Sequence, residues 1–351
     1  MRRALPLTLA ALVVAGCGSQ RAPGGAAAYA PRDAQAFISF RTDANWQPFA
    51  RLVLGRVPRV AKDAREAAFA VVRGKVVAVS TTGTPPARAL ADDARYRAAL
   101  QAVPSGVRGV AYVRGDVAAA RLQAIPGFVV AVPTALRRRG QSIGRLRFRW
   151  GAAWLTTDGV GGRLRSVRDT RTEAETQSAV EQVAQSYAPA LFDEIPADAR
   201  FVLDLRLAQG SFVVMPTLPA RVAALFSGDL IGIPGELDEV MQGETALYTR
   251  AGGELTLVTQ PSDTETARKA LAELAASFKV PRRLHVAAIG GQLVVSTSAA
   301  GIDAFRGGGP KLSAGIELPG RVTAVVYAAH RYIAWGAWEG SDPTVTIHFT
   351  R

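Results

Sequence analysis

The sequence is poor in the side chains on which metal, redox and nucleophilic chemistry most often depends. It contains one cysteine and three histidines in 351 residues. A single cysteine excludes a disulfide framework and any zinc or iron–sulfur site built from several thiolates. The histidines, His285, His330 and His348, follow no metal-ligand spacing. We therefore expect no metal, no cofactor and no catalytic residue.

Long hydrophobic runs and lysine are scarce as well. No stretch provides the roughly 20 apolar residues that a membrane-spanning helix needs. Only five of the 42 basic residues are lysine, so arginine carries most of the net charge of +13. The pI near 10.6 predicts attraction to polyanions such as nucleic acid, anionic lipid or cell-wall polymer. Hydrophobic residues make up 48% of the chain, which is enough to fold around a core.

The first seventeen residues have the layout of an export signal. Residues 1–3 are Met-Arg-Arg, and the following thirteen residues, 4–16, are uncharged and mostly apolar. This length suits the hydrophobic core of a signal peptide and is too short to span a bilayer. The sequence Val-Ala-Gly-Cys at residues 14–17 resembles the lipobox of bacterial lipoproteins.

The lipobox resemblance implies cleavage between Gly16 and Cys17, with a diacylglyceryl group on the Cys17 thiol. Two acyl chains anchor a protein stably, whereas a single chain is marginal. We therefore expect a lipid-anchored protein on the outer, extracytoplasmic face of the cell membrane. Residues 1–16 would be the signal peptide, and residues 17–28 a flexible tether. This location argues against nucleic acid as a partner.

A recurring pattern predicts the fold. Four times a proline precedes a short apolar strand, because proline ends a helix and favours an extended neighbour. These strands are predicted at residues 34–40, 107–113, 199–205 and 321–327. Hairpins and helices are predicted between them, with helices over residues 86–102, 172–192 and 263–278. We expect an α+β fold of repeated strand–helix–hairpin–helix units, forming mainly antiparallel sheets with helices packed on them, in halves 29–193 and 194–351.

Three stretches resemble an uncharacterised family of exported or lipid-anchored actinobacterial envelope proteins, known only as a domain of unknown function. They are residues 30–58, 89–116 and 235–271, and the second reads ALADDARYRAALQAVPSGVRGVAYVRGD. The resemblance implies an envelope location and the repeated α+β build. It brings no activity, cofactor or catalytic residue.

The most concentrated charge lies in residues 137–171, which hold ten arginines against two aspartates. Over residues 145–150, arginines alternate with Leu146, Phe148 and Trp150. A strand directs alternate residues to opposite faces, so the apolar residues are predicted to face the core and the arginines to face outward. The alternatives are a solvated surface, or contact with anionic lipid headgroups or cell-wall polymer. The candidate contact residues are Arg145, Arg147, Arg149, Arg163 and Arg165.

Two smaller groups of residues have structural and functional alternatives. The acidic residues Glu236, Asp238, Glu239 and Glu244 lack the order of a calcium loop, so we interpret them as a solvated acidic surface. Trp335 and Trp338 lie three residues apart. We interpret them as core or rim packing, with a ligand groove as the alternative.

These observations favour a lipid-anchored envelope protein with a non-enzymatic binding or scaffolding role. Its partners would be the membrane, through the anchor, and anionic lipid headgroups or cell-wall polymer. Two alternatives stay open. One is a carrier that holds a lipid or another apolar ligand in an internal cavity, and the other is an envelope enzyme with a dispersed active site.

Overall fold

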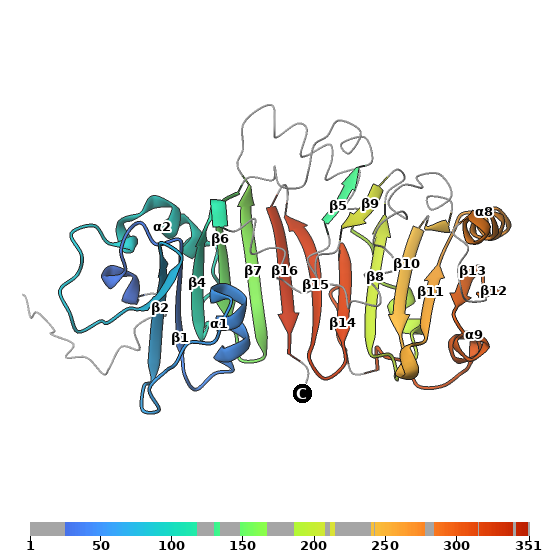
Figure 1. The fold of residues 1–351 in the computed structure, drawn as a ribbon, viewed down its shortest axis with the longest axis horizontal. Coiled ribbons are helices and arrows are strands. Elements are labelled where there is room, and N and C mark those ends of the chain that lie inside the picture. Colours follow the sequence, from blue (N-terminus) through green and yellow to red (C-terminus); the bar gives the residue numbers. More distant parts are fainter. Residues whose placement is uncertain are drawn as a thin grey trace, which may run out of the picture.

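One large antiparallel β-sheet dominates the computed structural model (Figure 1). The structure describes residues 25–117, 130–133, 148–166, 186–207, 211–214, 240–241, 243–277, 284–314, 316–339 and 342–349. Within these residues the strands stand side by side in a single row, and helices lie against the sheet and at its ends.

The elements have the following bounds. The first strands are β1 (Ala36–Arg41), β2 (Glu66–Val72), β3 (Lys75–Ala78), β4 (Gly109–Arg114), β5 (Val130–Pro133), β6 (Phe148–Leu155) and β7 (Gly159–Ser166). The later strands are β8 (Phe201–Leu207), β9 (Ser211–Val214), β10 (Gly243–Thr249), β11 (Leu255–Thr259), β12 (His285–Ile289), β13 (Gln292–Ser296), β14 (Ala324–Ala328), β15 (Tyr332–Glu339) and β16 (Asp342–His348). The α-helices are α1 (Trp46–Leu54), α2 (Ala94–Gln101), α8 (Thr264–Ser277) and α9 (Ala299–Arg306). The 3₁₀ helices are η1 (Gly25–Tyr29), η2 (Leu90–Asp92), η4 (Leu191–Glu194) and η6 (Ala251–Gly253).

The strand order has a pseudo-two-fold axis between β7 and β16. The sheet of 14 strands runs β12-β13-β11-β10-β8-β14-β15-β16-β7-β6-β4-β1-β2-β3, and β5 pairs separately with β9. Counted outward from the β7–β16 pair, the strands correspond one to one: β6 with β15, β4 with β14, β1 with β8, β2 with β10, and β3 with β11. Equivalent hydrogen bonds support the match. Leu90 N donates to Ala30 O at 2.8 Å, and Leu312 N donates to Ile195 O at 2.8 Å.

The expected α+β architecture of repeated units is wrong. The four strands that follow prolines form as β1, β4, β8 and β14, but all of them belong to one sheet, in which β1 pairs with β4 and β8 with β14. The unpaired N–H and C=O groups at a hairpin's edge need hydrogen-bond partners, and the next hairpin supplies them. The hairpins therefore join sideways into one sheet. The division into halves at residues 193 and 194 stays a prediction.

The structure also changes the predicted helices. The predicted helix 86–102 contains only η2 and α2. Asp93 between them has an extended backbone, and its side chain accepts hydrogen bonds from Arg95 N and Tyr96 N at 2.8 and 3.3 Å. Such a residue is an N-cap, which starts a new helix. The predicted helix 263–278 corresponds to α8, and most of the predicted helix 172–192 lies outside the described residues.

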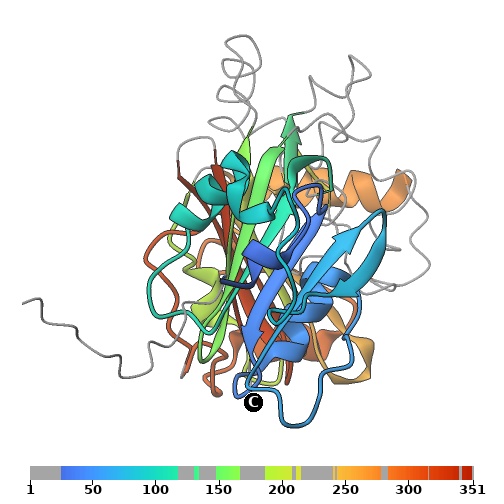
Figure 2. The ribbon, with the colours of Figure 1, turned by 90° about the vertical axis from the view of Figure 1, so that its left-hand side faces the viewer.

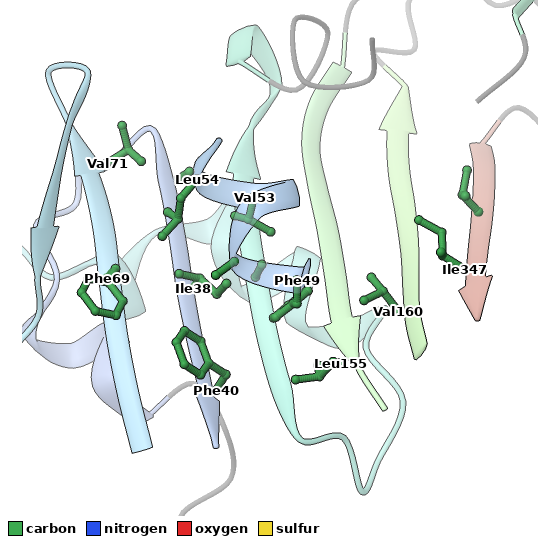
Figure 3. Packing of buried hydrophobic residues seen from close by; sticks show 14 of the residues in the cluster. Ile38, Phe40, Phe49, Val53, Leu54, Phe69, Val71, Leu155, Val160 and Ile347 are labelled. Carbon is green, nitrogen blue, oxygen red and sulfur yellow. The ribbon is translucent and has the colours of Figure 1, made fainter. Parts of the chain in front are cut away.

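Hydrophobic side chains cover both faces of the sheet, because successive strand residues point to opposite sides. One face, which we call the α1 face, is covered in part by α1. Here Phe49 of α1 packs with Ile38 and Phe40 of β1 and with Leu155 of β6 (Figure 3). The cluster reaches Ile347 on β16, across the centre of the sheet.

We call the opposite side of the sheet the α2 face, and Figure 2 shows α1 and α2 on opposite sides. The ring of Tyr96 from α2 meets Phe37 and Tyr112 edge-on, with centroid distances of 5.9 and 5.6 Å. Towards the other end of the sheet, Phe192 of η4 and Phe305 of α9 are buried in a second cluster.

Candidate functional site

The predicted anchor residues and part of the predicted arginine surface lie outside the described residues. Gly16 and Cys17 belong to residues 1–24, and Arg145 and Arg147 belong to residues 134–147. Their roles stay predictions.

The structure corrects the predicted alternation around Arg149. Phe148 pairs with Ser166, whereas Trp150 pairs with Arg165, so Arg149 lies in a β-bulge. The inserted residue changes the face of the sheet to which the side chains after it point. Phe148 therefore belongs to a cluster on the α1 face and Trp150 to one on the α2 face. The expectation that both face one core is wrong.

The remaining candidate arginines are split between exposed and half-buried positions. Arg149 is exposed, whereas Arg163 and Arg165 are half-buried. Arg163 lies opposite Ala152 and Arg165 opposite Trp150, which puts both arginines on the α2 face. Their contact with an anionic surface stays a prediction.

Two tryptophans come into register on the four central strands. Trp154 on β6 lies opposite Gly161 on β7, and Gly161 lies opposite Thr346 on β16. Thr346 in turn lies opposite Trp335 on β15. We call these four residues the tryptophan row. The row lies on the α2 face. Trp335 packs on the cluster around η4 and α9. Ala152, which lies two residues before Trp154 on the same side of β6, packs near α2. With strands about 4.8 Å apart, the row spans roughly 14 Å.

The glycine in the row is required by the neighbouring indole. A Cβ atom placed on Gly161 would lie 2.2 Å from Nε1 and 2.3 Å from Cε2 of Trp154. The Trp154 ring therefore lies down over β7, towards the pseudo-two-fold axis, and any side chain at residue 161 would displace it. Trp154 remains half-buried in this position.

At the other end of the row, Trp335 stacks on a histidine. Its ring lies 4.9 Å from that of His348, with 17° between the planes. Nδ1 of His348 lies 3.3 Å from Oδ2 of Asp158, which joins β16 to the turn between β6 and β7. A hydrogen bond of 2.9 Å from the Thr156 hydroxyl, together with His348, holds the pKa of Asp158 below its usual value. The half-exposed His348 ring is thus fixed against Trp335.

Polar groups border the row. Arg163 lies opposite Thr344, two residues from the Gly161–Thr346 pair. The Thr344 hydroxyl donates to Ala337 O at 3.2 Å. Half-buried aromatic rings offer apolar faces, and a guanidinium group carries five N–H donors for oxygen atoms. The arrangement suits a ligand that combines flat apolar surfaces with oxygen acceptors. Among the described residues no group of three or more His, Cys, Asp or Glu is placed to hold a metal ion.

No family model, curated protein or solved structure matches this chain. The resemblance to bacterial lipoproteins and to the envelope family therefore stays a prediction, as does the membrane location. In the part of the chain that the structure describes, no helix is both long and apolar enough to cross a membrane.

Of the two tryptophans in the row, the sequence singled out only Trp335 as a candidate. It paired Trp335 with Trp338, three residues away, whose side chain lies outside the described part. The structure instead aligns Trp335 with Trp154, which lies near the middle of the chain. The hairpin turn at Asp158 and Gly159 would have placed Trp154 near Gly161, but no local signal reveals that β7 pairs with β16.

A second polar cluster is buried within the α2 face. Tyr187 donates its hydroxyl hydrogen to Oδ1 of Asp204 at 2.8 Å, and Oε1 of Glu244 accepts a hydrogen bond from Leu191 N at 2.7 Å. Asp204 is fully buried. Burial, reinforced by the nearby Glu244 carboxyl, raises the pKa of Asp204 well above its usual value, and burial also raises the pKa of Glu244.

Glu244 therefore does not belong to a solvated acidic surface, as its sequence neighbours suggested. The 3₁₀ helix η4 covers it and uses it as a hydrogen-bond acceptor. Glu236, Asp238 and Glu239 lie outside the described residues. Carboxyls with raised pKa values are common in active sites. Because Asp204 is inaccessible to solvent, we assign the pair to holding η4 on the sheet.

One sequence pattern was passed over in expecting no catalytic residue. Residues 140–144 read Gly-Gln-Ser-Ile-Gly, the G-x-S-x-G spacing of a nucleophile elbow, with Ser142 at the centre. An elbow needs a strand before the serine and a helix after it. Here the strand β6 begins six residues after the serine, and the serine lies outside the described residues. The required context is therefore not met on the C-terminal side.

Proposed function

We propose that this chain is a lipid-anchored protein of the cell envelope that binds a ligand without chemical conversion, through the tryptophan row. The lipobox-like sequence ending at Cys17 supports the anchor. The single observation that supports the binding surface is the row itself, in which two half-buried tryptophans from distant parts of the chain align across the centre of the sheet.

The contrast between the two faces of the central strands strengthens this proposal. On the α1 face, Leu155, Val160 and Ile347 are buried. On the α2 face of the same strands, Trp154 and Trp335 are only half-buried. Burying apolar surface stabilises a fold by about 25 cal/mol per Å², so leaving two indoles partly in water forgoes stability.

The other two candidate functions gain no supporting observation from the described residues. An enzyme would need converging reactive groups that a substrate can reach, and the Asp204–Glu244 pair is buried. A carrier would need an apolar cavity, whereas the described apolar side chains form packed clusters on the two faces.

Two measurements test the proposal. In cells fed an alkyne-tagged fatty acid, the wild-type chain should take up the label and Cys17→Ser should not, since Cys17 is the only thiol.

Wild-type protein in detergent should co-sediment with isolated cell-envelope fragments, and Trp335→Ala should lose most of this binding. Trp46→Leu is the matched control, because Trp46 stacks on Phe40 on the α1 face. An unlabelled wild type would contradict the anchor, and equal sedimentation of all variants would contradict the binding surface.

A further inference from the structure

Building on the proposed binding function, we infer that the ligand of the tryptophan row is a linear acidic polysaccharide that lies across β6, β7, β16 and β15. The inference rests on three features of the row. These are the flat setting of the Trp154 ring, the length of the row with its pseudo-two-fold symmetry, and the positive charge beside it.

The Trp154 ring is set flat over the neighbouring strand. The Trp154 indole lies over Gly161, and the Trp335 ring is nearly parallel to that of His348. Both tryptophans are half-buried. A side chain that inserts into a membrane must project from the surface. A level aromatic face instead suits another flat surface, and the C–H face of a sugar ring is apolar and complements the electron-rich face of an indole.

The row is long and repeats itself. Trp154 and Trp335 are separated by three strand spacings, roughly 14 Å. They occupy equivalent positions about the pseudo-two-fold axis, since the central pair Gly161–Thr346 lies between them. A ligand with repeated rings would engage both ends at once, and two linked contacts strengthen each other through effective concentration. A single small ring would reach only one end.

The charge beside the row favours an acidic chain. Arg163 and Arg165 lie on the same face on β7. Arginine binds carboxylate with two parallel hydrogen bonds, which gives direction as well as attraction. The nearby Asp158 carboxylate contacts His348 and Thr156. The net charge of +13 adds long-range attraction for a polyanion.

The test is a titration of the full-length protein in detergent micelles, followed by isothermal calorimetry and tryptophan fluorescence. The probes are sodium polygalacturonate, neutral dextran, and mixed micelles that contain phosphatidylglycerol. We expect binding of polygalacturonate and none of dextran. Trp335→Ala should weaken binding about tenfold. Arg163→Gln should weaken it and reduce its salt dependence.

Three further variants guard against misfolding. Thr346→Val keeps the side-chain shape and should weaken binding by removing a hydroxyl, with an unchanged unfolding midpoint. Trp46→Leu on the α1 face and Arg268→Gln on α8 should bind like the wild type.

Three results would overturn the inference. If neutral dextran bound as tightly as polygalacturonate, charge would play no part in recognition of the ligand. Binding of phosphatidylglycerol but not polygalacturonate, with loss in Trp335→Ala, would make the ligand a lipid surface and leave the proposed binding function intact. If the row variants bound polygalacturonate like the wild type, the ligand assignment would fall, and the proposed binding function would fall with it only if envelope co-sedimentation were also unchanged.

Discussion

At the scale of single residues, the least expected feature is a pair of carboxyl groups inside the sheet. Asp204 occupies an apolar strand position between Leu203 and Leu205, and Glu244 lies on the neighbouring strand β10. Both are stabilised by donors from the segment that covers them, Tyr187 and Leu191 N. The strand pattern alone could not predict this, because the donors come from a segment distant in sequence.

The pair predicts a pH dependence of stability. The pKa of Asp204 is raised in the folded state, so between the unfolded and folded pKa values the folded protein binds more protons. The contribution of Asp204 to stability should therefore be full at or below about pH 4 and be lost as pH rises towards the folded pKa. Asp204→Asn removes this ionisation and keeps an acceptor for Tyr187, so it should flatten the decline.

Urea unfolding at several pH values between 4 and 8 measures this effect. Asp303→Asn, on the exposed side of α9, is the matched control and should decline like the wild type. An unchanged slope in Asp204→Asn would show that this carboxyl does not titrate in the range.

At the scale of elements, the sequence predicted strands better than their partners. The proline-led strands lie close to the predicted residues, and hairpins form between them as β2–β3, β10–β11 and β12–β13, because alternation and turn residues act locally. The bulge at Arg149 was not visible, since it depends on how β6 pairs with β7. The predicted helix 86–102 was too long because the capping role of Asp93 was not recognised.

This cap gives an element-scale prediction. Asp93→Ala removes the hydrogen bonds to Arg95 N and Tyr96 N and the ion pair with Arg32 at 3.5 Å. Loss of an N-cap costs about 1 kcal/mol. The unfolding midpoint measured by circular dichroism should fall by a few degrees. Asp92→Ala, at the exposed neighbouring residue, serves as the control. An equal fall of the unfolding midpoint in Asp92→Ala would show that the cap is not the cause.

At the scale of the whole molecule, the sheet itself creates the candidate site. Four strands from distant parts of the chain meet at the pseudo-two-fold axis, and only their register brings Trp154 and Trp335 together. Composition and the N-terminal segment led to an envelope protein that binds rather than reacts, and this location stays a prediction. The sequence pointed to the arginines of β7 but not to the tryptophan row, because β7 and β16 are far apart along the chain.

Residue-resolved hydroxyl-radical footprinting of the full-length protein with isolated cell-envelope fragments tests the central claim most directly. Oxidation of each tryptophan is read by mass spectrometry with and without the fragments. The account predicts that oxidation of Trp154 and Trp335 falls several-fold while oxidation of Trp46 is unchanged. Equal oxidation of Trp154 and Trp335 in both samples, or protection of Trp46 alone, would contradict it.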